Sequence, residues 1–288
     1  MSKRTPASVV TYSPRALLVL ALVSLIGLAM YGWPLLASAE SEVAHSADAP
    51  IIFAVILGML IFVVLAEVAS GGLDAKALAV LGVLSALAAV LRPFGAGMSG
   101  FQPMFVVLII GGRVLGPGFG FALGLVSMLG SALLTGGVGP WLPFQMLGAA
   151  WLGMGAGLLP SYRGKAEVTL LAAYAAVSGI LYGFLLNLWF WPFVTSTDTA
   201  ISFVPGDPVL ENLGRFFVYC LITSLGFDIP RAIGLVVIIA LAGGPLLRTL
   251  RRTTRKANFA AAVHFEPGRA ASTARVSPTS HDQAAKPH

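Results

Sequence analysis

Long apolar stretches separated by short polar segments occupy most of the chain between residues 15 and 247. A helix that spans a membrane needs about 20 apolar residues, with a range near 17–25. The stretches lie at about residues 15–36, 51–69, 76–91, 101–115, 118–134, 142–160, 167–193 and 215–247. Several of them are short and rich in glycine, which predicts tilted or broken helices packed against other parts of the protein.

The last apolar stretch is too long for a single crossing. Its 33 residues would reach about 50 Å at 1.5 Å per residue, against about 30 Å of hydrocarbon. We place a break at Asp228, Ile229 and Pro230, because proline disrupts a continuing helix. The pattern then predicts a helix over residues 211–227 at the outer mouth and a final span over residues 230–247. The fold class is therefore an all-α polytopic membrane protein with about eight transmembrane helices.

The charges between the stretches set the topology, because cytoplasmic loops are enriched in Lys and Arg. Residues 1–14 carry Lys3 and Arg4 and are expected in the cytoplasm, whereas the first loop carries acids and no base and is expected outside. Alternation then places residues 253–288, a basic tail with little to bury, in the cytoplasm as a disordered segment. The N-terminus also resembles a cleaved signal peptide, but its apolar stretch exceeds the usual 7–15 residues, so we favour a retained helix.

Composition agrees with a membrane protein and argues against catalysis. Hydrophobic residues make up 57% and charged residues 10% of the 288 residues, whereas a soluble domain has about 25% charged. The chain from residue 248 holds eight basic and two acidic residues, which accounts for the net charge of +6 and suits anionic lipid better than nucleic acid. Cys220 is the single cysteine, and all four histidines lie outside the apolar stretches. We therefore expect no metal, no cofactor and no enzymatic activity.

Small residues recur at intervals of four in three stretches. The first row is Gly116, Gly120 and Gly124; the second is Gly153 and Gly157; the third is Ala175, Gly179, Gly183 and Asn187. Small residues allow helix backbones to approach closely in a membrane. We interpret most of these glycines as packing positions.

Three segments resemble the substrate-binding S components of energy-coupling-factor (ECF) transporters. Residues 75–92 resemble the first core helix of that family, residues 110–124 resemble its second helix, glycine-proline turn and third helix, and residues 134–145 resemble its outer loop. The resemblance implies a six-helix core over residues 75–252. It leaves two extra transmembrane helices in residues 15–70, which the minimal family plan lacks.

The resemblance also implies a function in the cell membrane of a prokaryote. An S component binds a B-vitamin-like micronutrient and works with a transmembrane T component and two cytoplasmic ATPase subunits. In that family the first core helix docks onto the T component through small residues at intervals of four, which here match Ala75, Ala79, Gly82 and Ala86. A stand-alone secondary permease and a non-transporting membrane scaffold are the alternatives. A permease would need repeated halves and an ion site at the midplane, neither of which is visible in the sequence.

A solute site in a helical bundle is expected to place a few polar groups among aromatic side chains. Trp141 follows a glycine-rich loop and suits a lid over a flat ring, whereas an interfacial aromatic belt is the favoured interpretation of Trp189 and Trp191. Asp228 and Arg231 are three residues apart and can also neutralise each other. The candidate substrate-binding residues are Gln102, Trp141, Phe144, Gln145, Asn187, Trp191, Arg215, Asp228 and Arg231.

Overall fold

The computed structural model describes residues 14–36, 49–70, 75–95, 100–193 and 200–257, and within these ranges every regular element is a helix. The α-helices are α1 (Pro14–Tyr31), α2 (Trp33–Leu36), α4 (Ala49–Ser70), α5 (Ala75–Leu91), α6 (Met104–Leu115), α7 (Pro117–Thr135), α8 (Leu142–Leu158), α9 (Lys165–Phe190), α10 (Val209–Thr223) and α11 (Leu225–Ala257). Two short 3₁₀ turns, η1 (Pro93–Gly95) and η2 (Trp191–Phe193), follow α5 and α9. The all-helical fold class is confirmed.

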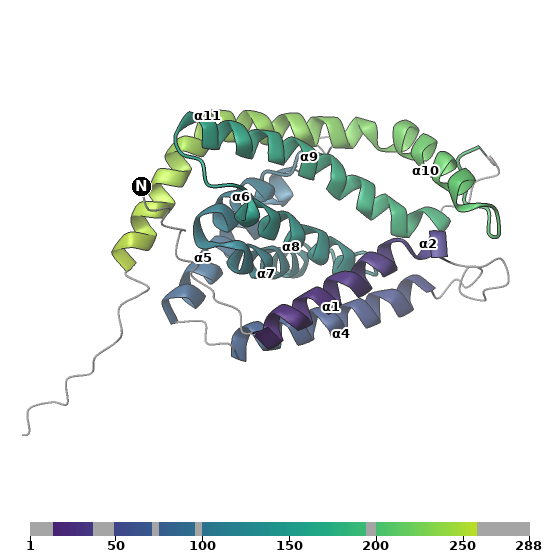
Figure 1. The fold of residues 1–288 in the computed structure, drawn as a ribbon, viewed down its shortest axis with the longest axis horizontal. Coiled ribbons are helices and arrows are strands. Elements are labelled where there is room, and N and C mark those ends of the chain that lie inside the picture. The colour runs from purple at the N-terminus through teal and green to yellow at the C-terminus, as the bar shows by residue number, and fades with distance from the viewer. Residues whose placement is uncertain (1–13, 37–48, 71–74, 96–99, 194–199, 258–288) are drawn as a thin grey trace, which may run out of the picture.

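The helices form a bundle in which α6, α7 and α8 lie between two helix pairs (Figure 1). Helices α9 and α11 run side by side along one edge of the bundle, and α1 and α4 pair on the other side. Helix α10 lies at the end of the bundle where α9 finishes and α11 begins. Because α5 to α8 alternate in direction, the ends of α5 and α7 and the starts of α6 and α8 meet at one end, here called the pocket end.

The break in the last apolar stretch is not where the sequence placed it. Helix α10 ends at Ser224, which forms a turn with αR backbone angles before α11 begins, and Pro230 lies inside α11. Ser224 ends α10 because its backbone N–H bonds to Cys220 while its carbonyl accepts from Phe227 and Asp228, which starts the next helix. Pro230 is tolerated because it lies near the start of α11, where few intrahelical bonds exist to be lost. Farther along, α11 bends (Figure 1), and Pro245 accounts for the bend.

Four helical segments in the described part of the chain are long and apolar enough to cross a membrane: Ala75–Gly95, Pro117–Thr135, Lys165–Phe193 and Leu225–Thr254. Leu17–Tyr31 and Met104–Leu115 are apolar but shorter. The short α6 is enclosed by protein, since ten of its residues are buried, and such a helix need not match the bilayer thickness by itself. The count of eight spans remains a prediction.

The first two glycine rows are confirmed as packing positions at the contact of α6, α7 and α8, and the third row, on α9, packs against α11, where a Cβ at Gly179 would lie 3.2 Å from Leu235 Cδ1. A Cβ at Gly120 would lie 2.5 Å from the carbonyl carbon of Gly153 and 2.8 Å from the Cα of Gly112. A Cβ at Gly124 would lie 2.5 Å from the Cα of Ala150 on α8. Only residues without a Cβ permit this backbone approach, so the three helices form the rigid centre of the bundle.

Polar contacts attach the N-terminal pair to the core. The Tyr31 hydroxyl donates to the carbonyl of Phe144, and Trp33 Nε1 donates to the carbonyl of Trp189 over 3.1 Å. Trp151 Nε1 donates to Ser24 Oγ over 3.0 Å. Aromatic N–H and O–H groups buried in an apolar setting need such partners, so α1, α2 and α4 are integral to the fold.

Candidate functional site

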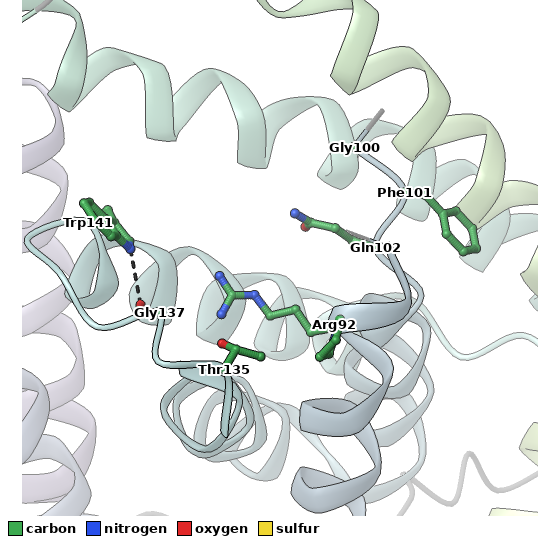
Figure 2. Close-up of a pocket in the computed structure, with 9 residues that line it drawn as sticks. Arg92, Gly100, Phe101, Gln102, Thr135, Gly137 and Trp141 are labelled. Carbon is green, nitrogen blue, oxygen red and sulfur yellow. Dashed lines mark hydrogen bonds between the residues drawn. The ribbon is translucent and has the colours of Figure 1, made fainter. Parts of the chain in front are cut away.

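A pocket of about 380 Å³ opens at the pocket end (Figure 2). Its volume falls at the lower end of the range for small-molecule sites, about 300–1,000 Å³. The pocket is lined by Arg92, Pro93, Gly95, Gly100, Phe101, Gln102, Thr135, Gly137 and Trp141. It therefore brings together two of the candidate binding residues, Gln102 and Trp141.

Arg92 is the charged residue of the pocket lining. Its backbone is held by helical bonds, because its N–H donates to Ala88 over 3.2 Å and its carbonyl accepts from Gly95 over 3.1 Å. Its Nη2 donates to Gln145 Oε1 over 2.8 Å. In Figure 2 the guanidinium extends toward the side of the pocket occupied by Trp141, and the amide of Gln102 extends in the same direction. The two polar groups thus face one space.

The segment that carries Gln102 is anchored to α11. Gly100 has a φ of 81° and lies against the backbone of Phe227, an arrangement that excludes a side chain. The ring of Phe101 points away from the pocket (Figure 2) and packs against Gly234. The Gln102 Oε1 atom is buried and has no hydrogen-bond partner. An unsatisfied buried acceptor costs about 1–3 kcal/mol, so this side of the pocket is built to receive a donor.

Trp141 lies at the pocket rim and is 44% exposed. Its ring packs on its own loop at Gly139, and its Nε1 donates to the carbonyl of Gly137 over 3.3 Å. Gly136 ends α7 in the left-handed conformation with a φ of 68°. The indole therefore has one face available beside the pocket, which is what a ring-stacking lid requires.

Two further candidates on α8 lie behind the lining. Gln145 accepts the hydrogen bond from Arg92 and so positions the guanidinium. Phe144 is fully buried and stacks on Trp189, with ring centroids 4.2 Å apart and an interplanar angle of 3°. Trp189 is only 2% exposed, so its placement in an interfacial belt was wrong. It lies in the core because Phe144 of α8 stacks on its ring and Trp33 of α2 donates to its carbonyl.

A second polar group lies between α9 and α11. Arg231 Nη1 bonds Asp228 Oδ1 over 2.6 Å and the Gly179 carbonyl over 3.0 Å, which confirms the pair expected from their spacing. The guanidinium also lies 5.7 Å from the centroid of the Tyr182 ring. Asn187 Nδ2 donates to Ser224 Oγ over 2.6 Å. These contacts link the two helices, although Arg231 Nε is buried without a partner among the described residues.

The remaining candidates lie around α10. Arg215 pairs with Asp207 over 2.6 Å and with Glu211 over 3.8 Å. Trp191 is 1% exposed and donates through Nε1 to the carbonyl of Ile201 over 2.7 Å. It packs on Phe216 in a separate aromatic cluster. Arg215 thus ties α10 to the segment before it, whereas Trp191 ties η2 to α10, and its burial shows that an interfacial belt was the wrong interpretation of this residue too. Both residues lie outside the pocket lining.

The candidate docking residues share one face of α5. Ala75, Ala79, Gly82 and Ala86 are all exposed, whereas Ala77, Leu81, Ser85, Ala88 and Ala89 turn inward. A Cβ at Gly82 would meet nothing within 4 Å. This exposed face, which we call the α5 small-residue face, is therefore flat and available to a helix of another protein.

A buried ion-pair cluster, which was not predicted from the sequence, lies at the end of the bundle opposite the pocket. Glu167 is 1% exposed, and it accepts from Arg113 Nε over 2.7 Å and from Arg251 Nη2 over 2.6 Å. Arg113 also donates to the carbonyls of Leu159 and Pro160 over 2.8 and 2.9 Å. One carboxylate thus joins α6, α9, α11 and the end of α8.

Arg92 was also missed, because a basic residue at a helix end is unremarkable in a sequence. The signal that would have found it is the long acid-free stretch around it: no Asp or Glu occurs from residue 75 to residue 166. An arginine there cannot find a carboxylate among its sequence neighbours.

Comparison with known proteins adds one match. A family model described as "ECF transporter, substrate-specific component" matches residues 76–243, which is more than half of the chain. No curated protein and no solved structure matches. The match covers the helices that form the pocket and the helix that carries the α5 small-residue face.

Proposed function

The chain belongs to the family of substrate-specific components of ECF transporters, and we propose that it captures a B-vitamin-like micronutrient in the pocket at the ends of α5 to α8. Families of this kind are transporter components and not enzymes. The observation that carries the proposal is the pocket itself, because a cationic side chain, an unsatisfied amide oxygen and an indole converge there. Such a mixture of few polar groups and an aromatic is typical of small-molecule sites.

The pocket end is the extracellular end in this proposal. Basic residues beside α1 and beyond α11 favour cytoplasmic termini, and alternation then puts the ends of α5 and α7 outside. Solute would therefore enter from outside and leave on the other side, with energy supplied by a T component and two ATPase subunits. Helix α10, amphipathic and placed where α9 finishes and α11 begins, would lie at the outer mouth.

The α5 small-residue face is the proposed docking surface for the T component. Its residues are exposed in the bundle, and packing between membrane helices depends on such small residues. Gly82→Leu would add bulk to the docking surface while leaving the interior untouched, since nothing lies within 4 Å of a Cβ there. We expect uptake to fall while solute binding by the isolated protein persists. Ala79→Leu should behave in the same way.

The test is co-expression with candidate T and ATPase subunits, followed by co-purification and uptake measurements. An S component retains those subunits and requires them for uptake, whereas a permease transports alone and a scaffold binds no solute. Leu78→Ala is a matched control, because Leu78 is exposed on the same helix but is not one of the small residues. Parallel loss of binding and uptake in Gly82→Leu would contradict the docking role.

Sidedness has its own test. A cysteine at Ser202, in a Cys220→Ser background, should react with an impermeant thiol reagent from outside intact cells. A cysteine at Thr273, which lies outside the described residues, should not react. Labelling of the tail from outside would refute the proposed orientation.

A further inference from the structure

We propose that the pocket selects a small anionic solute, with Arg92 binding its carboxylate or phosphate group and Gln102 accepting a hydrogen bond from an N–H of the same molecule. This inference rests on the proposed function and narrows its substrate class. It derives from the charge balance of the pocket, from one unsatisfied atom and from the pocket's size.

Arg92 has no counter-ion in the part of the chain that the structure describes. Among the described residues no carboxylate forms an ion pair with it, and the one acid of the neighbouring cluster, Asp228, is bound to Arg231 at 2.6 Å. The residues between Gly95 and Gly100, which the structure does not describe, include no acid in the sequence. Arg92 is only partly buried at the end of α5, where a long basic side chain keeps its charge by reaching toward water. The pocket therefore carries a local positive charge that a bound anion would balance.

Arg92 is also oriented for this task. The bond from Nη2 to Gln145 Oε1 over 2.8 Å fixes one edge of the guanidinium, so the side chain does not need to be ordered when the ligand arrives. Arginine presents several N–H donors in one plane and matches a carboxylate or phosphate with two parallel bonds. Thr135 lies beside it in the lining, with its hydroxyl donating to the Ser131 carbonyl over 2.8 Å. The Thr135 hydroxyl is uncharged and its proton is already donated, so it does not neutralise the charge of Arg92.

Gln102 defines the second contact. Its amide extends into the same space as Arg92 (Figure 2), and its buried Oε1 has no partner among the described residues. A ligand N–H would satisfy this acceptor. The indole of Trp141 borders the space and suits a flat ring between the two polar contacts. A volume of about 380 Å³ favours a compact acid of this kind over a large cofactor.

The experiment uses the full chain in nanodiscs of phosphatidylcholine and two matched pairs of probes, nicotinate with nicotinamide and biotin with biotin amide. Members of a pair differ only in the acidic group, so the ratio of their dissociation constants measures anion selection. We expect at least one pair to bind with a preference of about 10- to 100-fold for the acid, the range of a charge-assisted contact. Arg92→Gln should abolish the preference, and Arg92→Lys should keep part of it. Arg163→Gln, which removes an exposed arginine from the loop between α8 and α9, should leave it unchanged.

A second measurement identifies the natural solute. Small molecules released by denaturing the wild-type protein, purified from its own cells, should include an acid detected in negative-ion mass spectrometry and absent from Arg92→Gln. A released solute that is neutral or cationic, or an acid preference that survives in Arg92→Gln, would overturn the inference while leaving a solute-binding function intact. The inference would also be overturned if no probe bound and no solute were released. In that case, co-purification of T and ATPase subunits would test the proposed function separately.

A lipid headgroup offers the same phosphate chemistry, and the nanodisc composition separates the two sources. Phosphatidylglycerol added to the discs should not displace the acid probe. Displacement that disappears in Arg92→Gln would assign Arg92 to lipid and refute solute selection.

Discussion

The contact of α7 with α8 offers the sharpest test of the packing, through a matched pair of glycine replacements. Gly120 and Gly82 both lie inside apolar helices, α7 and α5. A Cβ at Gly120 would lie 2.5 Å from the carbonyl carbon of Gly153, whereas a Cβ at Gly82 would meet nothing within 4 Å. The same change, Gly→Ala, therefore enters a backbone contact at one position and open space at the other.

The magnitude follows from the geometry. Carbon atoms pack at about 3.5–4.0 Å, so an alanine at position 120 requires α7 and α8 to move apart by about 1 Å. The obstacle is backbone and cannot rotate away, which puts the cost toward the upper end of the usual overpacking range, about 3 kcal/mol. Alanine also gains about 0.5–1 kcal/mol over glycine inside a helix. Because both variants share that gain, it cancels in their difference.

The assay is an apparent melting temperature in detergent, measured by the protein that remains monodisperse after heating. At about 2–4 °C per kcal/mol, Gly120→Ala should melt about 6–12 °C below Gly82→Ala, and Gly82→Ala should melt at or slightly above the parent. A difference below about 2 °C would refute the close backbone contact of α7 with α8.

Three further predictions follow from other contacts. Glu167→Ala strands Arg113 in the bundle and should destabilise the protein by about 3–5 kcal/mol, measured as melting temperature, whereas Glu167→Gln should cost less because its oxygen still accepts. Cys220 lies in α10, outside the candidate spans, and burial raises the pKa of its thiol to about 11. Carbamidomethylation of this thiol should therefore be slow at pH 7.4, and its rate should rise about tenfold per pH unit up to pH 10. A rate that levels off near pH 9 would contradict this. Trp141→Ala should weaken solute binding by up to about a hundredfold, mainly through faster release. Trp189→Ala should instead lower stability, because that ring stacks on Phe144. Equal binding by Trp141→Ala and the parent would contradict the lid role of Trp141.

The helix ends predicted from the sequence agree closely with the structure wherever polar residues or glycine flank an apolar stretch. Residues 51–69 became α4 (Ala49–Ser70), and residues 142–160 became α8 (Leu142–Leu158). The break before α11 was misplaced because a local rule about Pro230 was given more weight than the turn at Ser224, whose side chain also accepts from Asn187. That contact joins residues distant in the chain, so no local pattern indicates it.

The aromatic residues show a different limit. Lipid tails are as apolar as a leucine side chain, so composition does not distinguish a tryptophan that faces lipid from one that faces protein. The Trp189 ring is covered by Phe144 of α8 and its carbonyl accepts from Trp33 of α2, and both helices are far from it in sequence. Arg92 was missed for a related reason. Arg92 is of interest because no described residue close to it in space offers a carboxylate. Which residues lie close to it is known only once the helices are assembled.

Helix α5 links the two proposed surfaces physically. Ala79 on its exposed face and Arg92 just beyond its end are thirteen residues apart, about 20 Å along a helix axis. The inward side of α5 packs on α6 and α7, and those helices are held to α8 by backbone contacts at Gly112, Gly120 and Gly153. A force applied to the α5 small-residue face therefore cannot shift Arg92 alone without breaking that packing. Such a force either moves α5 to α8 as one body or opens the pocket at its less constrained rim, the Gly136–Trp141 loop. Variants that loosen the glycine contacts should therefore uncouple docking from solute release without altering either surface.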